Sequence, residues 1–269
     1  MSEPESSEEK STAGRNYAVP IVVGLLILFM GIRLAMKYGS RPEEKLAPTS
    51  PSNTVRPMGY TTNLPTANAN AALTESEQAT KLINEGTELL ATGRVDEAVA
   101  KFQSALQLTP EDEDVHYDLA IAFARLGKTA EAIHHYEEAL RLFPDYVEAH
   151  NNLGNLLLKQ AKLDEAGQHF RAAAKLAPDN AIAHNGIGIV LGRQGKPGEA
   201  IAEFLEAVRL DPQYVEGRFN LGNTYLMQKN GDAAAEQFTE ILKINPTFEL
   251  AAKGLTNAQA LMARRKIIP

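Results

Sequence analysis

Five prolines spaced at a constant interval constrain the fold of this chain more than any other feature. They lie 34 residues apart, at Pro110, Pro144, Pro178, Pro212 and Pro246. A proline has no amide hydrogen and its ring clashes with the preceding helical turn, so it ends or kinks a helix. Prolines at a fixed interval of this length therefore mark the boundaries between copies of one helical unit. The sequence predicts a solenoid, in which each copy packs mainly against its neighbours.

The copies agree with one another at several further positions. We number each copy so that the proline is position 32, which gives copies 79–112, 113–146, 147–180, 181–214 and 215–248. Position 8 is glycine or alanine, position 20 is alanine and position 24 is phenylalanine or tyrosine in every copy. Small residues let two helices approach closely, and one aromatic ring per copy fills the core between them. Position 15, glycine in three copies, is expected in the turn between the two helices.

This pattern is similar to that of the tetratricopeptide repeat. The resemblance covers 79–248 and implies an all-α, right-handed α-solenoid of five helix–turn–helix repeats. Thr74, followed three residues later by Glu77, is a capping-box signature, so we expect the repeat domain, 74–248, to begin there. Apolar residues continue on one helical face after the last proline, which predicts a capping helix and tail over 249–269.

Residues before the repeats divide into two expected segments, a polar tail and a membrane span. Residues 1–16 are rich in Ser and Glu without apolar periodicity, which predicts a disordered acidic tail. Residues 17–36 are apolar apart from Arg33 and long enough to span about 30 Å as a helix. A buried helix of a soluble domain and a cleaved signal peptide are the alternatives. The acidic amino end is unlike a signal peptide, so we expect a single-pass transmembrane helix.

The next segment, 37–73, is rich in Pro, Thr and Asn, and no helical or strand period survives in it. It is expected to be a linker between the membrane and the repeats. Two basic residues precede the apolar stretch, and four lie within it or shortly after it. This bias favours a cytoplasmic location for the repeats, but it is small and a large domain can cross regardless. The sequence therefore leaves the orientation in the membrane open.

Composition and motifs exclude several classes of function. The chain carries 34 acidic and 27 basic residues, whereas nucleic-acid-binding domains carry a basic excess, so we expect no nucleic-acid partner. It contains no cysteine. His116, His150 and His184 recur every 34 residues, which places them in successive repeats, too far apart to share one metal ion. No phosphate-binding loop or nucleophile motif is present. We expect no enzymatic activity, no metal site and no cofactor.

The resemblance also implies a binding surface. In tetratricopeptide repeat proteins the first helix of each repeat lines a concave groove through positions 2, 5, 6, 9, 12 and 13. Amides gather at these positions, similar to the asparagine ladder in the superhelical domain of O-linked N-acetylglucosamine transferase. An asparagine side chain both donates and accepts, so a column of them can pair with the backbone of a bound peptide. Three bases at position 13 could in turn meet an acidic partner. The expected partner-binding residues are Asn84, Asp118, Asn151, Asn152, Asn155, Asn185, Asn220, Asn223, Arg125, Lys159 and Arg193.

Two departures weaken the comparison with the ladder. Gly186 interrupts the column at position 6, and Asp118 in the same column cannot donate. A plainer interpretation is that these polar residues only solvate an open face. Likewise, the three bases of position 13 have acidic residues of position 2 near them in the repeat, and the two sets could simply pair.

These observations predict a membrane-anchored scaffold or adaptor that binds a segment of a partner protein in its groove. Assembly of a membrane or envelope complex is the expected setting, with a protein or peptide as one partner and the lipid bilayer, through 17–36, as the other. The alternative is a targeting or regulatory subunit that recruits a separate transferase to its substrates. The order of the segments alone does not distinguish the scaffold from the recruiting subunit.

Overall fold

The structure, a computed structural model, describes residues 74–267, with side chains as far as Arg265. All regular secondary structure in this part of the chain is α-helical, in eleven helices. The expected tail, transmembrane helix and linker, 1–16, 17–36 and 37–73, lie outside the described residues. Among the helices of the described part, none has both the length and the apolar character needed to cross a lipid bilayer.

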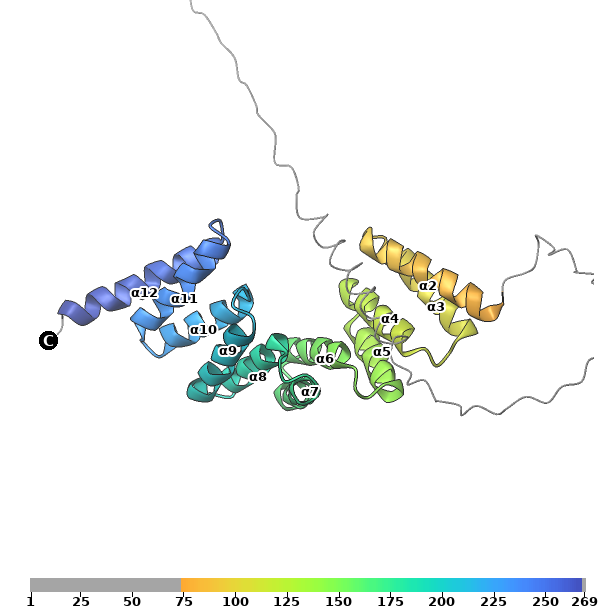
Figure 1. The fold of residues 1–269 in the computed structure, drawn as a ribbon, viewed down its shortest axis with the longest axis horizontal. Helices are drawn as coiled ribbons and strands as arrows, with labels where there is room; N and C mark the ends of the chain where they lie inside the picture. Colours follow the sequence, from red (N-terminus) through yellow and green to blue (C-terminus); the bar gives the residue numbers. More distant parts are fainter. Residues whose placement is uncertain (1–73, 268–269) are drawn as a thin grey trace, which may run out of the picture. The chain divides into compact units, whose positions relative to one another are not determined.

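The described helices form consecutive antiparallel pairs, one pair per repeat (Figure 1). The pairs are α2 (Glu75–Ala91) with α3 (Val95–Leu108), α4 (Glu113–Arg125) with α5 (Thr129–Leu142), α6 (Val147–Lys159) with α7 (Leu163–Leu176), α8 (Ala181–Arg193) with α9 (Pro197–Leu210), and α10 (Val215–Met227) with α11 (Gly231–Ile244). A single helix, α12 (Glu249–Ile267), follows the last pair. Each second helix ends two residues before the proline of its repeat, as the ring and missing amide of proline require.

The first helix begins at the predicted capping box. The hydroxyl of Thr74 accepts a hydrogen bond from the amide of Glu77 at 3.2 Å, and the Glu77 carboxylate accepts one from the amide of Thr74 at 2.8 Å. Two amides that have no partner inside the helix are satisfied in this way, which fixes where the helix starts.

The turn between the two helices of each repeat contains one residue in the left-handed region. This residue is at position 15, with φ of 82° at Gly93, 72° at Gly127 and 78° at Gly195. The two copies without glycine adopt the same conformation, with φ of 60° at Ala161 and 59° at Lys229. An L-residue with a Cβ is strained there, so the fold imposes this geometry on two residues that disfavour it.

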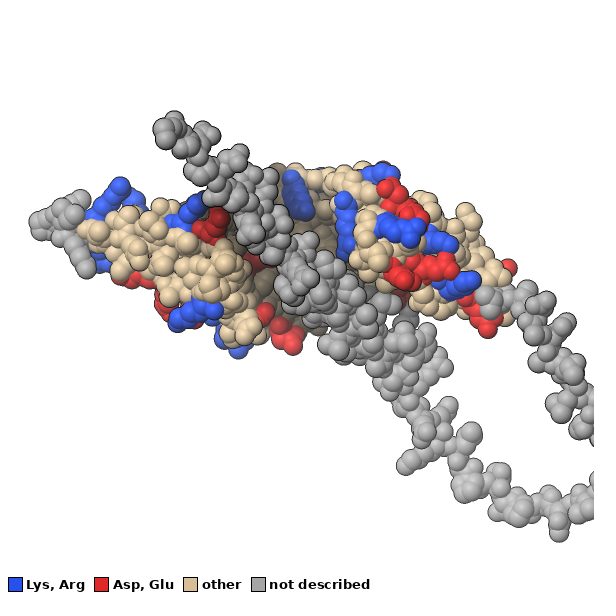
Figure 2. Space-filling view, turned by 90° about the horizontal axis from the view of Figure 1, so that it is seen from above, with Lys and Arg blue, Asp and Glu red and all other residues tan. Residues whose placement is uncertain are grey.

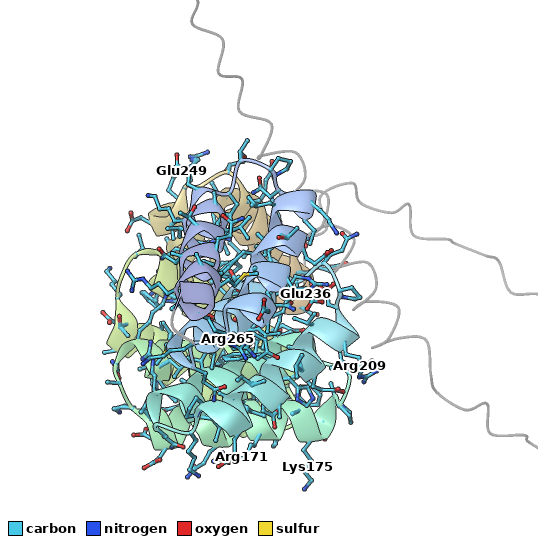
Figure 3. The ribbon with its side chains drawn as sticks, turned by 90° about the vertical axis from the view of Figure 1, so that its left-hand side faces the viewer. Arg171, Lys175, Arg209, Glu236, Glu249 and Arg265 are labelled. Carbon is cyan, nitrogen blue, oxygen red and sulfur yellow. The ribbon has the colours of Figure 1, made fainter. Side chains whose placement is uncertain are left out.

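The core follows the predicted columns. The aromatic residues of position 24 are exposed by 3% or less of their surface, and the alanines of position 20 are fully buried. Helix α12 covers the last repeat, with Ala251 and Ala258 fully buried against it. Seen from the end that carries α12, the labelled Arg171 and Lys175 of α7 and Arg209 of α9 point away from the array (Figure 3).

The repeats form a curved row, in which α2 and α6 lie on the inner side of α3 and α7 (Figure 1). Neighbouring even-numbered helices contact each other, as α6 does α8 and α8 does α10. We call the surface formed by α2, α4, α6, α8, α10 and α12 the inner face. Figure 2, drawn from above the row, shows Lys and Arg intermixed with Asp and Glu over the repeats rather than gathered by sign.

Candidate functional site

The inner face carries the residues that the sequence predicted to bind a partner, but these residues differ in accessibility. Asn84 and Asn155 are exposed, and Asn152, Asn220, Asn223 and Asp118 are half-buried. Arg125, Lys159 and Arg193 are exposed near the carboxyl ends of their helices. Asn151 and Asn185 are only 4% and 5% exposed, because both pack between neighbouring elements.

Several of these amides are hydrogen-bonded across repeat boundaries. Nδ2 of Asn220 donates to Oδ1 of Asn185 at 2.9 Å, and Nδ2 of Asn152 donates to the hydroxyl of Tyr117 at 3.0 Å. In both contacts a residue at position 6 meets the residue at position 5 of the preceding copy. Two residues of the predicted column at position 6, Asn152 and Asn220, therefore tie neighbouring inner helices together.

A second recurrent contact, which the sequence reasoning missed, explains the buried amides of position 5. In the second to fifth copies, the residue at position 5 contacts the residue at position 34 of the same copy. The rings of Tyr117 and Tyr146 stack with centroids 4.7 Å apart, and Nδ2 of Asn185 donates to the hydroxyl of Tyr214 at 3.2 Å. The only sequence signal is a constant 29-residue separation between chemically matched residues. In the last copy both positions are phenylalanine.

Asn151 occupies the same place in the middle repeat and is incompletely satisfied. Its Nδ2 donates to Oδ1 of Asn180 at 3.4 Å, a long hydrogen bond. Its Oδ1 is buried and has no hydrogen-bond partner among the described residues. A buried polar atom without a partner is costly, so this side chain lowers the stability of the middle repeat.

The gap in the column at position 6 has a steric cause. A Cβ at Gly186 would lie 2.3 Å from the ring of Phe170, which belongs to the preceding repeat. On its other side the same ring faces Gly154, where a Cβ would lie 2.9 Å from it. Phe170 thus occupies a slot between two glycines, and an asparagine at 186 would have no room. The last aromatic ring, Phe238, is held in the same way by Gly222 and Gly254.

Two of the three bases at position 13 have a structural partner. Nη1 of Arg125 donates to the carbonyl oxygen of Leu90 at 2.8 Å, and Nη1 of Arg193 donates to that of Leu158 at 2.7 Å. Each arginine thereby adds a side-chain donor at the carboxyl end of the preceding inner helix, where the helix dipole is negative. The same two carbonyls also accept from the amides of Gly93 and Ala161. Lys159 makes no such bond within the described part. The bases are therefore not a row of equivalent anion-binding groups.

Position 9 contributes the least constrained amides. It lies one turn after position 5 and one turn before position 13, and so on the same face of the helix. Asn155 and Asn223 occupy it in two copies, and neither makes a side-chain hydrogen bond within the described part. The fold therefore leaves the donors and acceptors of these two amides unused, with Asn155 exposed and Asn223 half-buried.

Apolar side chains are exposed on the later inner helices. Ile182 and Leu250, both at the starts of inner helices, are 46% and 53% exposed, and Met227 at the end of α10 is 77% exposed. Close to Met227, a hollow of about 320 Å³ is lined by Leu226, Asn257, Ala260, Leu261 and Arg264. The later half of the inner face therefore offers apolar contacts as well as amides.

A buried phenol lies behind this face, on the second helix of the second repeat. Burial, and next to it Tyr117, raises the pKa of Tyr136 well above its ordinary value, so this phenol stays neutral behind the inner face. Over residues 74–267, no group of three or more His, Asp or Glu side chains is arranged to hold a metal ion. What the arrangement offers chemically is hydrogen bonding and apolar contact.

Comparisons with known proteins agree with this architecture. A family model described as "Tetratricopeptide repeat" matches residues 117–181 and 185–247, and one described as "TPR repeat" matches residues 86–127. Together these matches span more than half of the chain. No curated protein matches the chain in sequence.

Three solved structures share the fold. MamA from Desulfovibrio magneticus RS-1 is 24% identical with a TM-score of 0.58, and the match covers 64% of this chain and 97% of that one. YrrB, described as a TPR protein with an unusual peptide-binding site, is 25% identical with a TM-score of 0.54, covering 66% and 92%. TTC0263, a thermophilic TPR protein from Thermus thermophilus, is 25% identical with a TM-score of 0.55, covering 66% and 98%. With its 34-residue period, paired helices and matching family models, the chain belongs to the tetratricopeptide repeat family.

Proposed function

We propose that this protein is a membrane-anchored scaffold whose inner face binds a segment of a partner protein. The observation that carries the proposal is a set of amides on the inner face that the fold does not use. Asn84, Asn155 and Asn223 make no side-chain hydrogen bond among the described residues. Amides spaced along a curved face pair well with the backbone of an extended segment, whose donors and acceptors also recur at regular intervals.

Apolar contacts add selectivity for side chains. The exposed Ile182, Met227 and Leu250 lie on the later repeats, whereas the amides extend from the first repeat to the fifth. A partner segment that runs along the inner face would place its backbone against the amides and apolar side chains against the later helices. YrrB, which shares the fold, is described as having a peptide-binding site, and this supports the same use of the fold here.

Membrane attachment is the second part of the proposal, and it is supported by sequence. The apolar stretch 17–36 would anchor the chain, and 37–73 would hold the repeats away from the bilayer. Resistance of the full-length protein to alkaline extraction from membranes tests the anchor. A topology reporter fused to the carboxyl terminus determines the side, which the weak bias of basic residues leaves open.

The partner-binding proposal is tested by cross-linking. A photoreactive amino acid at Asn155 samples the inner face, and one at Arg171, which points away from the array, is the matched control (Figure 3). We expect capture of one partner from position 155 and not from position 171. With the photoreactive amino acid placed at Met227 instead, which is 77% exposed at the end of α10, Asn155→Ala combined with Asn223→Ala should abolish capture without lowering thermal stability, because neither amide bonds within the described fold. Unchanged capture by this double variant would contradict the proposal.

We place the scaffold ahead of the alternative, a subunit that recruits a transferase. The alternative rests on similarity to a continuous asparagine ladder, but Gly186 interrupts the column, and Asn185 is buried between repeats. The same cross-linking experiment separates the two functions. An enzyme as the main captured species from position 155 would favour the recruiting subunit.

A further inference from the structure

A three-part contact recurs in the second to fifth repeats and is not explained by partner binding. In each, the side chain at position 4 of the first helix bridges two groups. One is the carbonyl oxygen of the proline at position 32 of the preceding copy. The other is the side chain at position 23 of the same copy, which lies on the second helix. The bridging residues are His116, His150, His184 and Arg218, and their partners at position 23 are His135, His169, Glu203 and Gln237.

In the second and third repeats the contact is a pair of histidines. Nδ1 of His116 lies 3.0 Å from Nδ1 of His135, and its Nε2 lies 3.3 Å from the carbonyl oxygen of Pro110. Nδ1 of His150 lies 2.9 Å from Nδ1 of His169, and its Nε2 lies 3.0 Å from the carbonyl oxygen of Pro144. We call these two contacts the histidine pairs.

The proton positions follow from the acceptors. A carbonyl oxygen only accepts, so Nε2 of His116 carries the hydrogen and, in the neutral ring, its Nδ1 has a lone pair. Nδ1 of His135 must then donate to it. One added proton is tolerated, because a charged His135 still donates. A second proton puts a hydrogen on both facing nitrogens, which breaks the bond and leaves two cations in contact. The same reasoning holds for His150 and His169.

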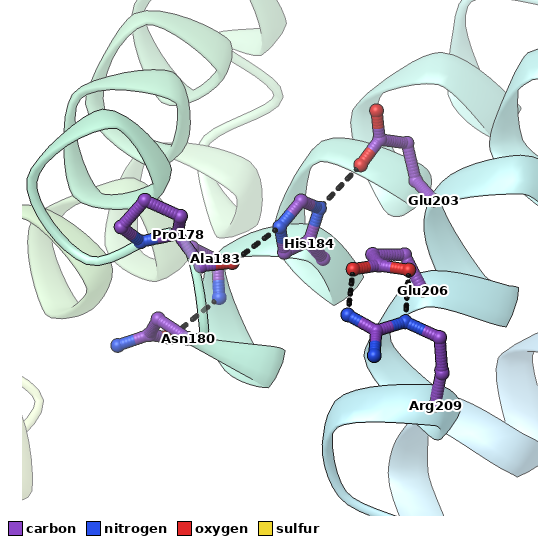
Figure 4. Close-up of polar contacts among 7 residues, drawn as sticks. All are labelled: Pro178, Asn180, Ala183, His184, Glu203, Glu206 and Arg209. Atoms are coloured by element: carbon purple, nitrogen blue, oxygen red, sulfur yellow. Dashed lines mark hydrogen bonds and ion pairs between the residues drawn. The ribbon is translucent and has the colours of Figure 1, made fainter.

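The fourth and fifth repeats serve the same acceptors without this conflict. Nδ1 of His184 lies 2.7 Å from Oε2 of Glu203, and its Nε2 lies 3.2 Å from the carbonyl oxygen of Pro178 (Figure 4). Both partners of His184 are oxygen acceptors, so neither of its ring nitrogens faces another ring nitrogen. Arg218 donates from Nε to the carbonyl oxygen of Pro212 at 2.9 Å and from Nη1 to Gln237 at 3.0 Å, and it stays charged.

We propose that the histidine pairs make the first three repeats acid-sensitive. Double protonation of a pair breaks the hydrogen bond between its two rings. The bridging histidine, with the carbonyl of Pro110 or Pro144 that it binds, then loses its link to the second helix of the repeat. The contacts at Pro178 and Pro212 are kept, because neither of them brings two ring nitrogens together. Acidification would therefore loosen one half of the array, at defined boundaries, while the other half keeps its geometry.

The charged surroundings of the pairs agree with this assignment. Near the first pair lie His134 and Glu138, the latter bound to Arg141, and Phe123 stacks on His135. Burial, followed by the charges of His116 and His134, lowers the pKa of His135 to about 4, against a smaller opposing effect of Glu138.

The second pair has similar surroundings. Burial, followed by the charge of His150, lowers the pKa of His169 to about 4, and Glu165 opposes this. Burial also lowers the pKa of His150, against the Pro144 carbonyl and Asp145. No carboxylate is hydrogen-bonded to a ring nitrogen of either pair within the described part, in contrast to Glu203 in the fourth repeat.

The sign of the pH effect follows from these shifts. In the unfolded chain each histidine binds a proton near its ordinary pKa of about 6.5. In the folded chain His135 and His169 resist protonation until about pH 4. The unfolded or locally open state therefore binds more protons between these values, and closure of these boundaries weakens as pH falls through that window. Above it, closure does not depend on pH through these groups.

The chain has no cysteine, which makes distance measurements between spin labels direct. Position 29 is exposed in the first, third and fifth copies, at Gln107, Lys175 and Lys243. Cysteines at 107 and 175 span both histidine pairs, and cysteines at 175 and 243 span the other two contacts. In full-length protein in detergent, we expect the first distance distribution to broaden between about pH 7 and about pH 4, and the second to stay unchanged.

Two variants make the test specific. Replacing both histidine pairs by the Arg–Gln pair of the fifth repeat (H116R, H135Q, H150R, H169Q) should remove the broadening at low pH. The reverse exchange, R218H with Q237H, should introduce it between 175 and 243, and this result does not depend on the first variant folding. The proposal is overturned if neither distance changes in the natural sequence, if both broaden equally, or if the Arg–Gln exchange leaves the broadening in place.

Discussion

Gly186→Ala is the substitution for which the structure predicts the clearest loss of stability. The new Cβ would lie 2.3 Å from Cδ1, 2.4 Å from Cε1 and 2.6 Å from Cγ of Phe170. The ring cannot move aside, because it is fully buried and its opposite side already faces Gly154, where the clearance for a Cβ is 2.9 Å. Helices α7 and α8 must therefore separate at the boundary between the third and fourth repeats.

The magnitude follows from two opposing effects. Carbon atoms in contact normally lie about 3.5–4.0 Å apart, so the overlap exceeds an ångström, and overpacking of a core typically costs about 1–3 kcal/mol. Alanine is favoured over glycine inside a helix by about 0.5–1 kcal/mol, which offsets part of this cost. We expect a net loss of about 1–2 kcal/mol, a sizeable share of the roughly 5–15 kcal/mol that stabilises a domain.

Urea unfolding of the full-length protein, followed by circular dichroism at the helical band, measures the effect. Gly198→Ala is the matched control, because the substitution is identical, the site is helical in α9, and a Cβ there would meet nothing within 4 Å. It should leave stability unchanged or raise it slightly. Adding Phe170→Leu to Gly186→Ala should restore part of the loss. If Gly186→Ala unfolds at the same urea concentration as Gly198→Ala, the packing argument is refuted.

Three further predictions concern other contacts, each measured by the same urea unfolding. Lys229→Gly should stabilise the fold by about 1 kcal/mol, since φ is 59° at this residue and glycine adopts that conformation without strain. An unchanged or lower urea midpoint would show that the backbone at Lys229 is not strained. Arg193→Ala should cost about 1 kcal/mol of stability, because the hydrogen bond to the carbonyl of Leu158 on the preceding inner helix is lost. Lys159 makes no such bond within the described part, so Lys159→Ala should leave stability nearly unchanged. Equal losses in the two variants would show that the Arg193 bond does not stabilise the fold. Asn151→Leu should stabilise by about 1–2 kcal/mol by removing a buried oxygen that has no partner, and a clear loss would show that this oxygen is satisfied.

The fold was predictable from sequence because its determinants repeat. The regularly spaced prolines, the small residues and the aromatic ring of each copy act through local sterics, and the same requirement recurs every 34 residues. The capping box at Thr74 is equally local, and the structure confirms it. At position 15 the column predicted the turn, although not that Ala161 and Lys229 would be held at positive φ in place of glycine.

The candidate site was less predictable, because the use of each polar side chain depends on the neighbouring repeat. Asn152 and Asn155 are three residues apart on one helix, yet the first bonds to Tyr117 of the preceding repeat and the second bonds to nothing in the described part. Periodicity places both on the inner face but does not say which one a neighbour engages. Gly186 shows the same limit, since only the packing of Phe170 explains why the column lacks an amide there.

The prolines that mark the repeats also create the acceptors on which the acid response depends. Each proline ends a helix, so the carbonyls around it have no partner within that helix and require a donor from elsewhere. The chain supplies the donor from position 4 of the next repeat, and it varies that residue and its partner from copy to copy. In a solenoid, stability is close to a sum of repeats and their interfaces, so a change at one boundary stays local. Titration of the histidine pairs would therefore alter the curvature of the early repeats without unfolding the later ones.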